Sequence, residues 1–153
     1  MDKEIWKDIV DYKGLYQVSN LGNIKSFYNN KERILKPRKV KDGYLMICLY
    51  KKGKGKNFQV HRLVAKYFIK NYNENLEVNH KDYNKENNKV DNLEMMTRIQ
   101  NVYDYFQKNS KTGIIGINIQ DGKYRVRYKK KEIGYFDTMQ KAEEALNNAR
   151  KEV

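Results

Sequence analysis

The apolar and polar positions of the first 70 residues change from an extended to a helical pattern. Before residue 60, short apolar runs bounded by turn residues predict strands, and they lie at 15–18, 24–27, 43–50 and 58–60. A turn-rich link at 19–23 joins the first two runs and indicates a hairpin. Residues 60–69 then predict a helix, because their apolar side chains fall on one face, namely Leu63, Val64, Tyr67 and Phe68.

The middle of the chain, residues 76–101, has the sequence LEVNHKDYNKENNKVDNLEMMTRIQN. A short apolar–polar alternation ends in His80, and the Asn-rich segment that follows is too polar for a core element. A second apolar run precedes Thr97 and Gln100, which have the spacing of a capping box at the start of a helix. The pattern predicts strand, loop, strand and helix, and in such a unit His80 and Asn101 can face each other across a small cleft.

The last 40 residues predict a unit of three strands and a helix after a linker at 109–113. The strands are predicted at 115–117, 123–128 and 132–136. Thr138 caps the helix, whose apolar stripe consists of Ala142, Ala145, Leu146 and Ala149. Alternation along the second strand places three cations on one sheet face, namely Arg125, Arg127 and Lys129.

These elements predict an α+β protein of three small modules. The modules are a β-rich segment at 1–59, a central unit at 60–108, and a three-stranded antiparallel sheet with one helix at 109–153. Because only 39% of the residues are hydrophobic and 33% are charged, we expect several thin cores and no single thick one.

The net charge of +13 is unevenly distributed along the chain. Residues 23–66 hold 13 Lys and Arg against two acids, a balance of +11, and residues 108–131 hold eight against one, or +7. Between them, residues 74–104 hold four Lys and Arg against seven acids, or −3. Two basic blocks around an acidic centre suit a protein that binds a polyanion at both ends and a cation in the middle. The alternative is that Lys, which outnumbers Arg 25 to 7, only increases solubility.

Composition also excludes several classes of protein. The single Cys48 cannot form an intramolecular disulfide, and together with two His it cannot complete a structural zinc site. No apolar run approaches the roughly 20 residues that span a bilayer, and the first four residues do not resemble a signal peptide. We therefore expect no membrane contact and a cytoplasmic location, which is the host cytoplasm if the protein is phage-encoded.

The central segment resembles the HNH (His-Me finger) nucleases, in the His-Asn-Asn form found in phage and intron homing endonucleases. The resemblance rests on Asn79-His80, on Asn92 twelve residues after the histidine, and on Asn101 nine residues further on. Residues 61–65, with the sequence HRLVA, match the segment that usually precedes this motif. Residues 6–22 resemble a small DNA-contacting module that commonly precedes HNH domains in homing endonucleases.

The C-terminal unit resembles the DNA-binding domain of plant ethylene-responsive (APETALA-type) factors. The resemblance rests on Gly116, on residues 124–127 and 134–138, and on the Ala-rich helix. It implies that the sheet enters the major groove and that Arg125 and Arg127 reach bases. Tyr124 stands where that family usually has Trp, and this chain has fewer arginines, so the resemblance implies weaker base specificity.

The HNH resemblance implies a ββα-metal core and a metal-dependent endonuclease that hydrolyses phosphodiester bonds of double-stranded DNA. In that family His80 would be the general base, Asn79 and Asn101 would bind one divalent cation, and Asn92 would tie the loop that orients His80. The cation is expected to be Mg²⁺, with Mn²⁺ as a substitute. An Asp often precedes the histidine in HNH proteins, and the neutral Asn79 attracts a cation less strongly. Asp82, Asp91 or Glu94 could compensate through water.

Basic residues elsewhere are candidates for phosphate contacts, which position a protein on DNA without reading its sequence. The candidates are Lys25, Lys36, Arg38, Lys39, Lys54, Lys56 and Arg62. Each of these lysines alone also fits a solvated strand face. His61 is either a structural residue or a phosphate contact or support beside His80.

Three functions therefore remain open at this point. The first is a monomeric HNH endonuclease that nicks DNA with a site preference. The second is a DNA-binding regulator with a degenerate, inactive nuclease core. The third is an RNA-binding protein, which the 13 Tyr and the basic composition favour but which does not explain the spacing of His80, Asn92 and Asn101.

Overall fold

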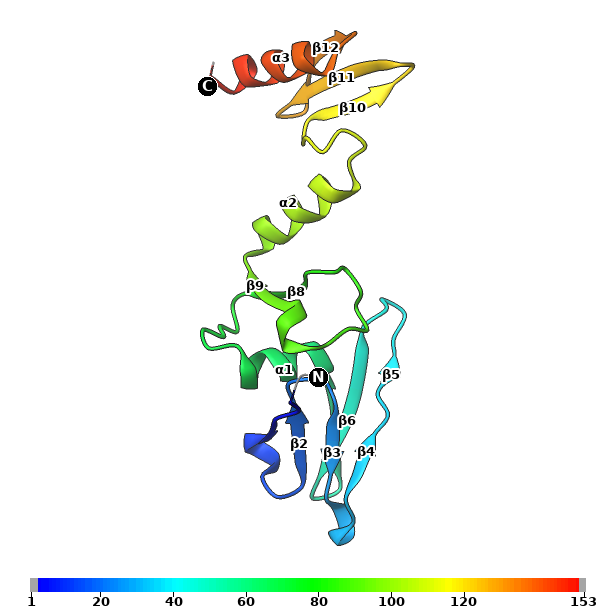
Figure 1. Cartoon of the computed structure of the whole chain (residues 1–153), viewed down its shortest axis with the longest axis vertical. Coiled ribbons are helices and arrows are strands. Elements are labelled where there is room, and N and C mark those ends of the chain that lie inside the picture. The colour runs from blue at the N-terminus through cyan, green and yellow to red at the C-terminus, as the bar shows by residue number, and fades with distance from the viewer. Residues whose placement is uncertain (1–2, 152–153) are drawn as a thin grey trace. The chain divides into compact units, whose positions relative to one another are not determined.

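The computed structural model describes residues 3–151 and has the predicted α+β architecture (Figure 1). The chain divides into two compact units, and the boundary falls between Arg98 and Ile99. No helix within residues 3–151 is long and apolar enough to cross a membrane.

The first unit begins with a four-stranded antiparallel sheet in the order β1-β2-β3-β4. Its strands are β1 (Trp6–Asp8), β2 (Tyr16–Ser19), β3 (Ile24–Ser26) and β4 (Arg33–Leu35). The predicted hairpin is confirmed, because β2 pairs with β3 with Val18 opposite Ile24. Both of these side chains are buried, so the hairpin presents its apolar positions to the core.

A second antiparallel sheet consists of β5 (Arg38–Lys39), β6 (Leu45–Lys51) and β7 (Lys54–Gln59). The two-residue turn between β6 and β7 is Lys52-Gly53, and both residues have positive φ, as this tight hairpin turn requires. Helix α1 (Val60–Phe68) starts directly after β7. A hairpin of β8 (Glu77–His80) and β9 (Leu93–Met96) completes the unit, and a loop of residues 81–92 joins its two strands.

One hydrophobic cluster joins the two sheets, α1 and the β8–β9 hairpin. Ile24 from the first sheet and Leu49 from the second are buried in the same cluster as Val64 of α1 and Val78 of β8. The predicted module boundary between residues 59 and 60 therefore falls inside a shared core. The division of the chain into three domains stays a prediction.

Helix α2 (Arg98–Asn109) begins with the last residue of the first unit, and the rest of it lies in the second unit. The second unit also contains β10 (Ile117–Gln120), β11 (Lys123–Tyr128), β12 (Lys131–Phe136) and α3 (Met139–Lys151). The predicted antiparallel sheet with one helix is confirmed, and its strands follow the order β10-β11-β12. This unit has a core of its own, built from Ile117, Val126, Ala142 and Leu146.

One sequence prediction in this unit is wrong, because Lys129 does not share the strand face of Arg125 and Arg127. Strand β11 ends at Tyr128. Lys129 and Lys130 form the two-residue turn to β12, with φ values of 46° and 67°. Two positive φ angles are the geometry of the tight turn that matches the twist of the strands, so the alternation of the strand stops before Lys129.

Candidate active site

Three aromatic rings from separate elements meet in the first unit. His61 lies in the first turn of α1, His80 ends β8, and Tyr44 lies just before β6. The ring centroids of His61 and His80 are 5.1 Å apart in an edge-on arrangement, and Tyr44 lies 4.8 Å from His61. Both histidines are nearly fully buried, at 3% exposure for His61 and 4% for His80. The predicted general base therefore sits in a defined, largely dehydrated position.

The side chain of Asn88 contacts His80 from the connecting loop. Oδ1 of Asn88 lies 3.1 Å from Nε2 of His80. The amide nitrogen of Asn88 donates to the backbone oxygen of Glu86 at 3.1 Å. Asn88 is itself 3% exposed, so this contact is shielded from water.

Burial makes both histidines weak bases. The pKa of His80 is lowered from its usual value, chiefly because burial disfavours the charged ring, while the hydrogen bond to Asn88 acts in the opposite direction. The pKa of His61 falls to about 3, first through burial and then through the neighbouring His80 and Arg62. Both rings are neutral at pH 7, and a neutral imidazole is the form that can accept a proton.

Asn79 precedes His80 on β8 and lies directly opposite Glu94 on β9. Its amide nitrogen donates to Oε1 of Glu94 at 3.2 Å, so its carbonyl oxygen is the atom suited to a cation. Amide and carboxylate oxygens are the ligands that hard cations such as Mg²⁺ prefer, and the donor chemistry of Asn79 and Glu94 fits such an ion. Within residues 3–151 no group of three or more His, Cys, Asp and Glu is arranged to hold a metal.

Asn101 lies on α2, in the second unit, whereas Asn79 and His80 lie in the first. Its predicted partnership with Asn79 in a metal site, across a cleft from His80, therefore stays a prediction.

Asn92 ties the loop of residues 81–92 together by hydrogen bonds. Its amide nitrogen donates to Oδ1 of Asp82 and to the backbone oxygen of Asn87, both at 2.8 Å, and its Oδ1 accepts from the backbone nitrogen of Asp82. Asn87 donates to the other oxygen of Asp82 at 2.7 Å. These bonds, with that from Asn87 first, lower the pKa of Asp82. The carboxylate of Asp82 thus holds the loop together by accepting hydrogen bonds from Asn87 and Asn92.

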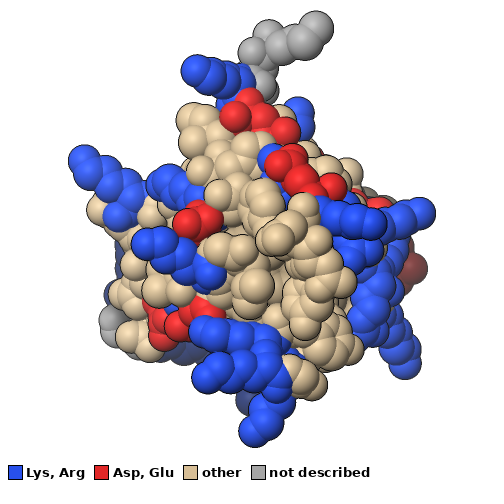
Figure 2. Space-filling model, turned by 90° about the horizontal axis from the view of Figure 1, so that it is seen from below, with Lys and Arg blue, Asp and Glu red and all other residues tan. Residues whose placement is uncertain are grey.

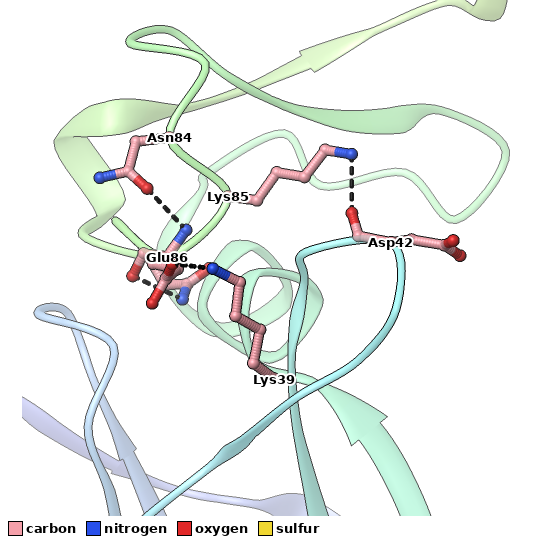
Figure 3. Close-up of polar contacts among 6 residues, drawn as sticks. Lys39, Asp42, Asn84, Lys85 and Glu86 are labelled. Carbon is pink, nitrogen blue, oxygen red and sulfur yellow. Dashed lines mark hydrogen bonds and ion pairs between the residues drawn. The ribbon is translucent and has the colours of Figure 1, made fainter.

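The same loop is bound to the sheet that carries β5 and β6 (Figure 3). Nζ of Lys85 donates to the backbone oxygen of Asp42 at 2.9 Å, and it also lies 4.5 Å from the ring centroid of Tyr44. Lys39 forms an ion pair with Glu86. The loop beside His80 is therefore held by residues that precede the HNH segment.

The predicted phosphate contacts lie mostly on the surface of the first unit. Lys36, Arg38, Lys39, Lys54 and Lys56 are exposed. Lys25 pairs with Glu32 at 2.7 Å and lies over the ring of Trp6, and Arg62 is half-buried at a cavity of about 400 Å³. Viewed from the end that lies at the bottom of Figure 1, groups of basic side chains lie around much of the outline, with acidic side chains between them (Figure 2).

In the second unit, Arg125 is held by neighbouring side chains. Its Nη2 lies 2.6 Å from Oε2 of Glu132, and its Nη1 donates to Oε1 of Gln120 at 3.2 Å. Arg127, on the same strand, is exposed and donates to the backbone oxygen of Lys130.

Sequence reasoning missed Asn88 and Tyr44, which contact the two histidines. Asn88 lies in the Asn-rich segment, and nothing in the local sequence separates it from Asn84 or Asn87. Tyr44 lies 36 positions before His80, so only the folded chain brings their rings to 6.1 Å.

Two segments of the chain, each less than half of its length, match known protein families. Residues 4–50 match the NUMOD4 motif, and residues 58–103 match the HNH endonuclease family. These matches confirm the resemblance of the N-terminal module and of the central segment to homing-endonuclease parts. They end at residue 103, so the likeness of the C-terminal unit to APETALA-type domains stays a prediction.

Among individual proteins, the chain is similar to DNA endonuclease I-HmuI of Bacillus phage SP01, with 50% identity over 105 residues. The match covers 69% of this chain and 59% of that protein. H-N-H endonuclease F-TflII of Escherichia phage T5 is 36% identical over 100 residues, which cover 64% of this chain and 50% of that protein. The chain thus spans between half and three fifths of the length of these relatives.

A solved structure also resembles this fold. It is described as DNA binding and cleavage by the HNH homing endonuclease I-HmuI, and it aligns with a TM-score of 0.64 at 50% sequence identity. The alignment covers 68% of this chain and 59% of that one.

Proposed function

We propose that this protein is a metal-dependent HNH endonuclease that nicks double-stranded DNA with a site preference. The observation that carries the proposal is the buried His80 at the end of β8, inside the segment that matches the HNH endonuclease family. The similarity to an endonuclease of a Bacillus phage supports DNA as the substrate. We further propose that the protein acts as a monomer, and in the host cytoplasm if it is phage-encoded.

In the proposed reaction His80 accepts a proton from the water that attacks the scissile phosphate. Asn79 and Asn101 would hold one divalent cation, Mg²⁺ or Mn²⁺, which when bound would supply Lewis acidity for the phosphate oxygens. Asn92 keeps the loop of residues 81–92 closed on Asp82, so the loop holds its shape beside His80.

Basic residues of each unit would contact the DNA. The exposed lysines and arginines of β5 and β7 supply this grip in the first unit. In the second unit Arg125 and Arg127 would read bases from the face of β11. Lys129, in the turn after β11, would contact phosphate.

The test is nicking of supercoiled plasmid DNA by the purified protein with Mg²⁺, with Mn²⁺ and with EDTA. We expect conversion to the open-circular form only with a divalent cation. His80→Ala should slow nicking by about 10²- to 10⁴-fold, because a general base typically contributes that much. Its DNA affinity, measured by fluorescence anisotropy, should change by no more than a few-fold. Equal nicking by the His80→Ala variant would refute the assignment of the base.

A second candidate function is a DNA-binding regulator with an inactive nuclease core. The observation that favours it is Asn79, a neutral residue at the position beside the histidine where a carboxylate would attract a cation more strongly. This function predicts DNA binding without nicking at any concentration of Mg²⁺ or Mn²⁺.

A further inference from the structure

Asn88 has a fixed orientation that constrains the imidazole of His80. An amide side chain has one accepting and one donating end. The donating nitrogen of Asn88 is used by the backbone oxygen of Glu86, at 3.1 Å. Its Oδ1 therefore faces Nε2 of His80, at 3.1 Å.

A carbonyl oxygen can only accept a hydrogen bond, so Nε2 of His80 must donate. In the neutral ring the proton then sits on Nε2, and the lone pair that can take a proton sits on Nδ1. Because both side chains are buried, water does not readily replace this partner. The rings of His61 and Tyr44 also lie beside His80, with ring centroids 5.1 and 6.1 Å away.

Gly22, in the NUMOD4 motif, lies directly against Asn88. A Cβ added at Gly22 would lie 2.9 Å from Cβ of Asn88 and 3.2 Å from its backbone oxygen. The turn between β2 and β3, which contains Gly22, is also bonded to the loop of residues 81–92. The backbone nitrogen of Val90 donates to the backbone oxygen of Asn20 at 2.8 Å. Only a glycine lets the turn approach the loop this closely.

We propose that Asn88 is a positioning residue that fixes His80 in the tautomer with its proton on Nε2, and that Gly22 holds Asn88 in place. The inference rests on the proposed function insofar as His80 is the base. It gives the NUMOD4 motif a role besides its predicted DNA contact, namely to support the loop of residues 81–92.

The tautomer is measured directly by two-bond nitrogen–proton correlation spectra of the ¹⁵N-labelled full-length protein at neutral pH. In the wild type we expect His80 to show a protonated Nε2 and an unprotonated Nδ1. A protonated Nδ1 in the wild type would overturn the proposal without any variant. Since this spectrum needs neither metal nor DNA, its result is independent of whether the protein cleaves.

The variants Asn88→Leu and Asn88→Asp separate positioning from packing. Leu keeps the approximate shape without an acceptor, so His80 should populate both tautomers and the nicking rate should fall about 10- to 100-fold, as for other supporting hydrogen-bond partners. Asp retains an acceptor and should restore the Nε2-protonated form. An unchanged tautomer in Asn88→Leu would refute the role of Asn88.

Gly22→Ala and Gly14→Ala form a matched pair for the second half of the proposal. Both glycines have positive φ, 88° and 75°, so both substitutions introduce similar backbone strain. At Gly14 an added Cβ meets no atom within 4 Å, whereas at Gly22 it meets Asn88. Gly22→Ala should therefore shift the His80 signals and reduce nicking, whereas Gly14→Ala should leave the His80 signals unchanged. Equal spectra for the two variants would show that Gly22 does not hold Asn88. If His80→Ala nicks normally while these spectra behave as expected, only the proposed function fails.

Discussion

Ile24→Ala tests whether the NUMOD4 motif and the HNH domain fold as one unit. Ile24 is fully buried in the cluster that also contains Val64 of α1 and Val78 of β8. Truncating a buried Ile to Ala costs about 2–5 kcal/mol, since it removes transfer free energy and leaves a cavity. For a unit of about 100 residues, each kcal/mol lowers Tm by about 4–8 °C, so a loss of about 3 kcal/mol predicts a fall of about 12–24 °C.

Two probes in different parts of the unit make this experiment decisive. Fluorescence of Trp6, the single Trp of the chain, reports the first sheet. Hydrogen exchange of the backbone amides of β8 and β9 reports the hairpin that ends in His80. We expect both probes to show the same loss of stability. Leu146→Ala, which empties a site in the separate core of the second unit, is the control and should leave the Trp6 transition in place. If Ile24→Ala lowers the Trp6 transition while β8 and β9 keep their protection, the two parts fold independently and our reasoning from the shared core is wrong.

The contribution of His61 to the free energy of unfolding should be fully present above about pH 6.5 and should be lost as the pH drops toward 3. Burial lowers the pKa of His61 from 6.5 to about 3, so between these values the unfolded chain binds a proton that the folded chain does not. Denaturant titrations over this range should show the slope, and His61→Phe should reduce it. Asn79→Asp should lower the Mg²⁺ concentration for half-maximal nicking, since a carboxylate attracts a hard cation better than an amide does; an equal or higher value would argue against Asn79 as a ligand. Deletion of residues 111–153 should leave nicking intact but make the choice of cleavage site less specific. Unchanged cleavage maps at matched salt would show that the second unit does not recognise the DNA sequence.

Local patterns predicted the elements that have a side-chain periodicity of their own. The β2–β3 hairpin, α1, the β8–β9 hairpin and the C-terminal sheet with α3 all followed from apolar spacing and turn residues. The three strands that were missed, β1, β4 and β5, are all edge strands of two or three residues. Such strands form because a neighbouring strand offers backbone hydrogen bonds, and a pair such as Arg38-Lys39 has no apolar pattern to reveal it.

The candidate site shows the same division between local and tertiary information. His80 could be predicted because its chemistry and its spacing to Asn92 are visible in the sequence. Asn88 could not be singled out among 18 asparagines, because its importance comes from a contact with His80 and from the close approach of Gly22, 66 positions earlier in the chain. Whether Lys129 lies on the strand face depends on where β11 ends. The turn sets that point, and the alternation of side chains before the turn does not reveal it.

The acidic partners of the basic residues modify what the charge of +13 implies for DNA binding. Lys25, Lys39 and Arg125 are each paired with a glutamate, namely Glu32, Glu86 and Glu132. The glutamate of each pair is exposed, and ion pairs at the surface contribute only about 0–1 kcal/mol each, so a phosphate can replace the carboxylate at small cost. A glutamate that stays beside the bound phosphate offsets the charge of its partner, and such a pair releases less counterion from DNA than a lysine alone. The salt dependence of binding should thus be dominated by the exposed cations of β5 and β7, such as Arg38, Lys54 and Lys56, while the paired residues mainly provide groups that are already oriented.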